Sequence, residues 1–142
     1  MIYLDSSYLV RLYYQDPGFE AVRQLAVTAP VACAQHGRAE VVAALHRKRR
    51  EGSLTEGLYR LALREFVAEI QAGAFTWLPL SPAVFARVEM AYAGLPSQVF
   101  LRAADAMHLA SAAERGLRDI YSNDQRVLAA ATHFGLRGVN VI

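Results

Sequence analysis

The chain opens with Met1-Ile2-Tyr3-Leu4-Asp5-Ser6-Ser7, an apolar run that ends on a carboxylate and two hydroxyls. Residues 2–5 are too few for a helix and predict a very short buried strand. Residues 7–14 then predict a short helix, which stops before the turn sequence Asp16-Pro17-Gly18. A short buried strand followed by a helix is the unit from which parallel sheets are built, so this stretch favours an α/β fold.

The same alternation of short apolar strands and helices continues along the chain. Pro82 at the first position of one helix, and Ser53 with Glu56 three residues later as a capping box before another, predict two helix starts. Strands this short and apolar need helices on both faces of their sheet. We therefore expect one three-layer α/β/α domain over residues 1–142, with no linker or repeat. The expected elements are strands at 31–34, 75–80, 119–122 and 138–141, helices at 19–28, 38–50, 53–73, 81–93, 102–115 and 124–134, and a loop at 94–101.

Composition narrows the class of protein. A hydrophobic fraction of 54% with 20% charged residues is typical of a globular chain, and a net charge of only +2 means that any nucleic-acid function must rest on local charge. The single cysteine, Cys33, excludes an internal disulfide and lies in an apolar run. No signal peptide fits the start, and no apolar stretch approaches the roughly 18 residues of a membrane span. We therefore expect a cytoplasmic protein with no membrane partner.

Four carboxylates far apart in the sequence stand beside apolar residues: Asp5 after the first strand, Glu40 early in the helix after the second, Asp105 in the first turn of an Ala-rich helix, and Asp124 after the fourth strand. Because the carboxyl ends of parallel strands share one edge, all four can reach the same rim. Unpaired carboxylates in apolar surroundings are costly, and Mg²⁺ or Mn²⁺ would hold them together. The pattern predicts metal-assisted phosphodiester chemistry with one or two ions.

Each carboxylate also has a structural interpretation. Asp124 could cap a helix, and Glu40 is electrostatically ordinary at a helix start. Asp5 is expected to have no such capping role, since a strand-terminal Asp followed by two serines needs hydrogen-bond donors or a cation. Asp105 is the most informative, because its helix is small or apolar nearly all round, as a buried helix would be.

Together these motifs resemble those of the PIN-domain ribonucleases, and most closely the VapC toxins of type II toxin–antitoxin modules. The resemblance covers the whole chain and rests on Met1–Val10, Glu40, Ala104-Asp105-Ala106 with the His-Leu-Ala that follows, and Ser122-Asn123-Asp124, where Ser122 replaces a common Thr. It implies a five-stranded parallel sheet of order 3-2-1-4-5. It also implies Mg²⁺- or Mn²⁺-dependent RNA cleavage that leaves a 5′-phosphate and a 3′-hydroxyl.

The resemblance also implies roles for residues and partners. Asp5 and Asp105 would lie closest to the metal, Glu40 and Asp124 would complete the site directly or through water, and Ser7 or Ser122 would hydrogen-bond a carboxylate or a metal-bound water. The implied partners are RNA and a cognate antitoxin, one of whose arginines would reach Asp5 and Asp105. We also expect a homodimer, with the apolar helices between Val22 and Ile70 contributing surface.

Several features stay open. Arg102 and Arg126 either bind substrate phosphate or form salt bridges, and the basic run 46–50 is either a solvated helix end or a phosphate-contacting patch. The histidines show no metal-ligand spacing, and His108 is expected to hydrogen-bond within the core. A DNA nuclease of the same fold and a non-catalytic nucleic-acid-binding scaffold remain alternatives. A haloacid-dehalogenase-type phosphatase is excluded, because it needs a second Asp where this chain has Ser7.

Overall fold

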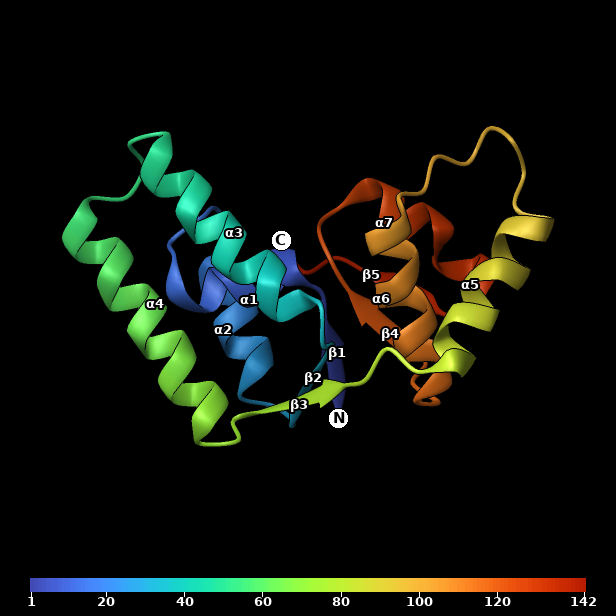
Figure 1. Ribbon diagram of the computed structural model, residues 1–142, viewed down its shortest axis with the longest axis horizontal. Coiled ribbons are helices and arrows are strands. Elements are labelled where there is room, and N and C mark those ends of the chain that lie inside the picture. Colours follow the sequence, from blue (N-terminus) through green and yellow to red (C-terminus); the bar gives the residue numbers. More distant parts are fainter.

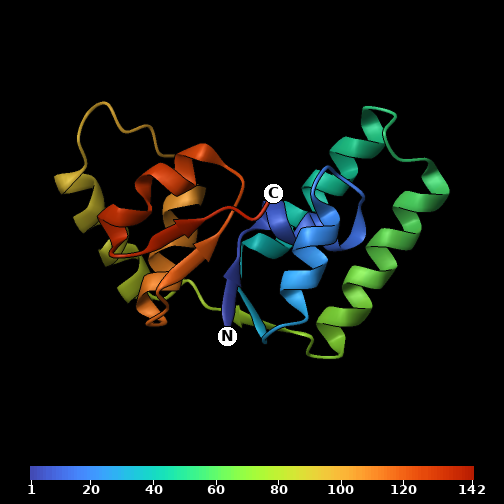
Figure 2. The same cartoon turned by 180° about the vertical axis from the view of Figure 1, so that it is seen from behind.

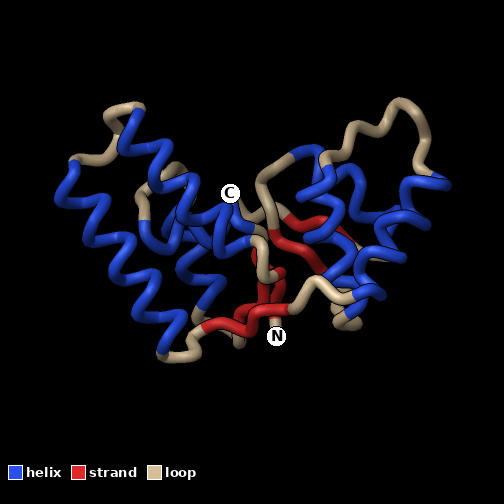
Figure 3. The backbone as a smooth tube through the Cα atoms, in the orientation of Figure 1, coloured by secondary structure: helices blue, strands red, loops and turns tan.

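A central parallel sheet organises the computed structural model, which describes all residues 1–142. The strands pair in the order β3-β2-β1-β4-β5, as predicted, with β1 at the centre between β2 and β4. The short strands lie between two groups of helices (Figure 3). Their bounds are β1 Ile2–Leu4, β2 Val31–Ala34, β3 Phe75–Leu78, β4 Asp119–Tyr121 and β5 Arg137–Val139.

Helices cover both faces of the sheet, which confirms the three-layer α/β/α prediction. Views from the front and from behind place α1 to α4 on one side and α5 to α7 on the other (Figures 1 and 2). No helix combines the length and the apolar character that crossing a bilayer would require. The helices are α1 Ser6–Tyr13, α2 Phe19–Ala26, α3 Gly37–Arg50, α4 Glu56–Gln71, α5 Pro82–Gly94, α6 Ala103–Glu114 and α7 Gln125–Ala130, followed by the 3₁₀ turn η1 Ala131–Phe134.

Alternating side chains of the strands divide the interior into two cores. Tyr3 and Ile120 pack in the core beneath α5, α6 and η1, whereas Leu4 and Cys33 pack in the core beneath α1 to α4. Successive side chains of a strand point to opposite faces, so each strand contributes to both cores. Cys33 is fully buried and unpaired, as its apolar surroundings predicted.

Two predicted helices differ from those observed. Helix α4 is capped by Thr55, whose hydroxyl accepts a hydrogen bond from the Leu58 amide at 3.3 Å, so the capping box predicted at Ser53 is wrong. The Ser53 amide instead donates to the Lys48 carbonyl at 2.9 Å and closes the end of α3. The helix predicted over 124–134 is divided into α7 and η1.

Candidate active site

The four predicted carboxylates meet in one cavity at the carboxyl end of the sheet. The cavity has a volume of about 570 Å³ and opens between the α1–α3 side and the α6–α7 side of the sheet. Two strand ends and two helix starts therefore supply one acidic surface. Its lining residues are Asp5, Ser6, Ser7, Glu40, Ala43, Ala44, Arg47, Arg102, Asp105, His108 and Asp124.

Asp5 lies at the floor of this cavity and is only 4% exposed. Its carboxylate accepts hydrogen bonds from the Ser7 hydroxyl at 2.6 Å, the Tyr8 amide at 3.1 Å and the Ser122 hydroxyl. The bond from Tyr8 makes Asp5 the N-cap of α1, so the expectation that Asp5 has no capping role is wrong. Burial raises the pKa of Asp5, while the nearby His108 and the two serine hydroxyls oppose that rise. Both predicted serines thus contact this one carboxylate.

Asp105 and Asp124 share a single guanidinium. Arg102 donates from Nε to Oδ2 of Asp105 at 2.8 Å, and from Nη2 to Oδ1 of Asp105 at 3.3 Å and to Oδ2 of Asp124 at 3.2 Å. Arg102 is therefore in a salt-bridge arrangement, one of its two predicted roles. The Asp105 side chain is 10% exposed and that of Arg102 is 53% exposed, so the cation covers the pair from the solvent side.

Asp124 also serves as a helix cap. Its Oδ1 accepts a hydrogen bond from the Arg126 amide at 2.8 Å, and its own amide donates to the Ser122 hydroxyl at 2.9 Å. The capping role of Asp124 is therefore confirmed, and it is compatible with the functional interpretation because the residue that caps α7 also lines the cavity. Ser122 links Asp124 to Asp5, so the fourth strand ties two of the carboxylates to each other.

The basic run 46–50 is mostly paired outside the cavity. Lys48 contacts Asp16 at 2.7 Å and Arg49 contacts Glu56 at 3.3 Å, both as salt bridges at the end of α3. Only Arg47 lines the acidic cavity. Most of the run is therefore a helix end with its own ion pairs, and one member is placed near the carboxylates.

A buried histidine holds Glu40 in place. His108, 2% exposed, approaches Glu40 Oε2 through Nε2 at 2.7 Å and the Tyr3 hydroxyl through Nδ1 at 2.7 Å, and the Ala34 amide donates to that hydroxyl at 2.9 Å. Burial lowers the pKa of His108, but its contacts with Cys33 and Glu40 outweigh burial and raise that pKa to about 10. Nε2–H therefore donates to the Glu40 carboxylate. The prediction that His108 hydrogen-bonds in the core is confirmed, but its link to Glu40 was not predicted.

The contact with His108 fixes the charge of Glu40. Burial alone would raise the pKa of Glu40, but the hydrogen bond and charge of His108 outweigh burial and lower that pKa to about 2. Glu40 is therefore a carboxylate at neutral pH. The hydrogen bond from His108 favours the ionised form of Glu40. The second oxygen of that carboxylate is then available as a metal ligand.

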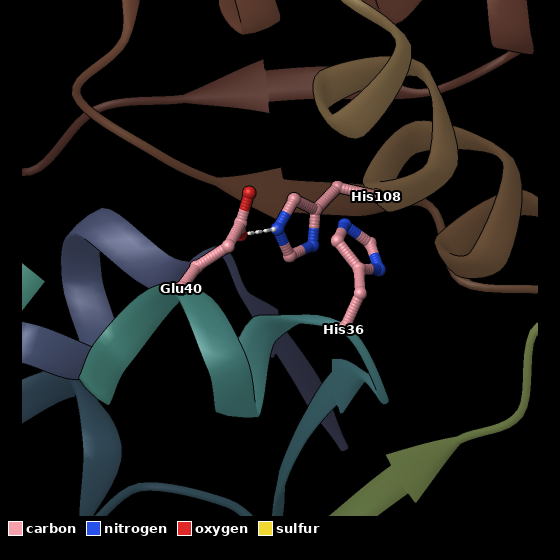
Figure 4. Close-up of side chains that lie close together, drawn as sticks. All are labelled: His36, Glu40 and His108. Carbon is pink, nitrogen blue, oxygen red and sulfur yellow. Dashed lines mark hydrogen bonds and ion pairs between the residues drawn. The ribbon is translucent and has the colours of Figure 1, made fainter. Parts of the chain in front are cut away.

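His36 completes a cluster with Glu40 and His108 that sequence spacing did not reveal. Figure 4 shows the His36 ring beside that of His108, with a centroid distance of 4.2 Å, while Glu40 points to the other side of His108. The three offer ligand atoms within 4.8 Å of one another. However, the 2.7 Å contact between His108 and Glu40 is shorter than the roughly 3.3 Å that separates two ligands of one tetrahedral ion. The cluster is therefore a hydrogen-bonded support for Glu40.

The sequence and the fold match known proteins. A family model described as PIN domain matches residues 2–132. The chain belongs to the PIN-domain family.

Solved structures share the fold of this PIN domain at low sequence identity. The crystal structure of FitAcB from Neisseria gonorrhoeae is 19% identical with a TM-score of 0.74, over 99% of this chain and 97% of that one. VapC20 of Mycobacterium tuberculosis is 20% identical with a TM-score of 0.65, over 92% and 95%. VapBC2 of Rickettsia felis, bound to a DNA fragment, is 14% identical with a TM-score of 0.68, over 99% and 98%. No curated protein sequence matches the chain significantly.

The donor set of the PIN-domain cavity fits a hard divalent cation. Carboxylate oxygens of Asp5, Glu40, Asp105 and Asp124 all line the cavity, and oxygen ligands are those that Mg²⁺ and Mn²⁺ prefer. Among these four, direct contact with a guanidinium is limited to Asp105 and Asp124. The cavity therefore carries an excess of negative charge that a cation would neutralise.

Proposed function

We propose that this PIN-domain protein is a Mg²⁺- or Mn²⁺-dependent endoribonuclease that acts as the toxin of a toxin–antitoxin module. The observation that carries the proposal is the meeting of four carboxylates from four separate segments in one cavity. A purely structural role would require no such meeting, because each of these side chains could cap or pair within its own segment. One or two ions bound there would polarise the scissile phosphate and supply hydroxide at neutral pH.

The protein's own side chains would position the reactants. Asp5 and Asp105 are proposed as the nearest metal ligands, with Glu40 and Asp124 completing the set directly or through water. Ser7 and Ser122 orient Asp5, and His108 orients Glu40, through the hydrogen bonds described above. Arg102 neutralises Asp105 and Asp124 before a cation binds and can turn toward the substrate phosphate afterwards, since its side chain is half exposed.

The toxin assignment is supported by the structural neighbours. The Mycobacterium tuberculosis protein is described as a toxin that cleaves the sarcin–ricin loop, and another neighbour is described as FitAB bound to a DNA fragment. We propose an antitoxin partner, a cytoplasmic location and a homodimer for this chain as well. In the region proposed for the dimer surface, α4 exposes Leu58, Leu61 and Val67. An antitoxin arginine that entered the cavity would have to replace Arg102 at Asp105.

The decisive experiment removes one charge at a time from the carboxylates. We expect Asp5→Asn or Asp105→Asn to lower RNA cleavage by at least two orders of magnitude and to leave the fold intact, because the amide keeps the shape but not the charge. Asp119→Asn is the matched control, because Asp119 pairs with Arg137 at 2.8 Å and does not line the cavity. Cleavage of an RNA oligonucleotide with Mn²⁺ and the circular dichroism spectrum are measured for each variant.

Four outcomes separate the candidate functions. Loss of RNA cleavage in the two cavity variants alone supports the proposal. Equal cleavage of RNA and of DNA with the same sequence would favour a DNA nuclease of this fold. Cleavage that survives in the purified cavity variants would exclude the carboxylate site, and a pure wild-type protein that binds nucleic acid without cutting it would favour the scaffold alternative.

A further inference from the structure

An aromatic ring stands exposed beside the acidic cavity. Phe100 lies in the loop between α5 and α6 and is 61% exposed. The next residue, Leu101, is only 9% exposed and packs in the core. The Tyr92 hydroxyl donates to the Leu101 carbonyl at 2.7 Å. The backbone that carries Phe100 is therefore anchored, and the ring is held outward by a fixed segment.

A cation lies against this ring. The Arg126 guanidinium is 4.6 Å from the centroid of the Phe100 ring, within the range of a cation–π contact. The residue remains 61% exposed in spite of this contact, which leaves ring surface accessible to a ligand. The pair thus presents a flat apolar surface with a guanidinium at its back.

Two contacts connect the same pair of segments and place this surface at the cavity. The first is the ion pair between Arg102 and Asp124 at 3.2 Å. The second joins Phe100, which is two residues before Arg102, to Arg126, which is two residues after Asp124. Two residues of extended chain span at most about 7 Å. The Phe100 ring is therefore anchored within one short step of the carboxylates at which cleavage is proposed.

We propose that Phe100 and Arg126 form a subsite for an unpaired nucleobase of the RNA substrate, next to the scissile phosphate. This inference rests on the proposed function and names the part of RNA that the site would hold. The base stacks on the open face of Phe100, and Arg126 both supports the ring and offers N–H donors to the adjoining phosphate. Stacking requires an unstacked base, so the substrate is single-stranded where it is cut.

Other exposed apolar side chains lack this combination. Phe85 and Met90 on α5 are 46% and 76% exposed, but neither has a cation over it, and neither is within two residues of a side chain that lines the acidic cavity, as Phe100 is of Arg102. An apolar protein contact would not need a guanidinium behind the ring. A nucleotide offers both a π face and an anionic phosphate, and the Phe100–Arg126 pair is complementary to both.

Binding to the metal-free protein tests the subsite without cleavage. The probe is a short unstructured RNA that contains the fluorescent base 2-aminopurine, scanned through each position. We expect quenching at one position in the wild type, and loss of that quenching with roughly 5- to 100-fold weaker binding in Phe100→Ala. Phe100→Tyr should retain both, because its ring also stacks. Phe85→Ala is the matched control and should behave as the wild type.

A second arm uses the same variants with an abasic residue in the RNA. Removal of the base that Phe100 holds should weaken wild-type binding to the level of Phe100→Ala, and should not weaken RNA binding by Phe100→Ala any further.

If Phe100→Ala binds as tightly as the wild type with the probe base at every position, the subsite is overturned, and so it is if the wild type binds tightly with no quenched position. If Phe100→Ala still cleaves and binds RNA normally, the subsite is wrong while the proposed nuclease stands. If the wild type binds this RNA but never cuts it, the nuclease fails while the quenching still decides the subsite.

Discussion

The two halves of the acidic cavity hold their carboxylates by different means. On the α1–α3 side, Asp5 and Glu40 accept hydrogen bonds from serine hydroxyls and from a histidine that is 2% exposed. On the α6–α7 side, Asp105 and Asp124 are held by Arg102, whose side chain is 53% exposed. Hydroxyl and imidazole donors leave other oxygen lone pairs of a carboxylate open to a cation. A guanidinium competes with a cation for the same charge. The first half is therefore prearranged for the proposed metal, whereas a metal in the second half would have to displace the Arg102 guanidinium.

After the carboxylates themselves, the largest expected effect is at His108, in the prearranged half. His108→Gln keeps an N–H donor at the position of Nε2, which faces Glu40, whereas His108→Asn keeps only a polar group near Nδ1, which faces Tyr3. We expect His108→Asn to weaken Mn²⁺ binding and cleavage by about 10- to 100-fold, the usual cost of losing a residue that orients a metal ligand. His108→Gln should recover most of that loss.

Mn²⁺ affinity is measured by calorimetry, alongside thermal unfolding of each variant. Because His108 is buried, both substitutions lower stability, so stability alone cannot distinguish them. Equal Mn²⁺ affinity in the two variants at matched stability would show that the contact with Glu40 does not orient a ligand.

Metal binding should stabilise the whole protein. Clustered carboxylates repel one another, and a ligand that binds only the folded state adds about 2.7 kcal/mol at 100 times its dissociation constant. For a domain of this size that corresponds to a rise in Tm of roughly 8 °C. Scanning calorimetry with and without Mg²⁺ measures the rise. It should disappear in Asp105→Asn and persist in Asp119→Asn, and an unchanged wild-type Tm at millimolar metal would remove the basis for a metal site.

At Arg102, on the α6–α7 side of the cavity, we expect a smaller effect on Mn²⁺ affinity, and one of opposite sign. Arg102→Gln removes the competing cation and should tighten Mn²⁺ binding by about two- to tenfold, since Arg102 is 53% exposed and solvent screens each of its ion pairs to about 0.2–1 kcal/mol. RNA cleavage should nevertheless fall, if the released Arg102 binds phosphate. Arg102→Lys keeps the charge without the bidentate geometry, so its Mn²⁺ affinity and its cleavage rate should lie between those of the wild type and those of Arg102→Gln. Mn²⁺ affinity that weakens in Arg102→Gln would mean that Arg102 supports the metal site and does not compete with it.

The sequence predicted the location of the carboxylates better than their partners. Short apolar strands imply a parallel sheet, and a parallel sheet brings strand ends such as Asp5 and Ser122 to one edge whatever the loops do. The bond between His108 and Glu40 joins residues 68 positions apart, and no local pattern encodes such a contact. Arg102 illustrates a second limit, because its position near Asp105 was evident while its choice between phosphate and carboxylate depends on the position of Asp124 in space.

Helix starts show where local rules compete. Ser53 and Thr55 are both good caps by residue type. Leu54, between them, is 7% exposed and packs in the core, so burial of its side chain fixes which of the two stands at the helix start. Asp5 is the reverse case, because a strand-ending carboxylate can cap the next helix and remain a candidate ligand at once.

The smallest effect distinguishes the two serines on Asp5. Ser7 is half-buried at the start of α1 and donates one bond, to Asp5 Oδ1 at 2.6 Å, where the Tyr8 amide also donates. Ser122 is fully buried, donates to the other oxygen of Asp5, and accepts from the Asp124 amide. Ser7→Ala therefore leaves Oδ1 with a donor and should reduce cleavage only a few-fold. Ser122→Ala leaves the Asp124 amide without its acceptor and should cost about 1–3 kcal/mol of stability.

Cleavage rates and urea unfolding of the two variants test this difference. Ser122→Thr is the control, because it restores a hydroxyl and should recover most of the stability that Ser122→Ala loses. If Ser7→Ala proves the more damaging in cleavage at unchanged stability, the Ser7 hydroxyl contacts something other than Asp5 during the reaction. The prearranged half of the cavity would then include a serine that acts on metal-bound water or on substrate, and its difference from the Arg102 half would lie in chemistry as well as in charge.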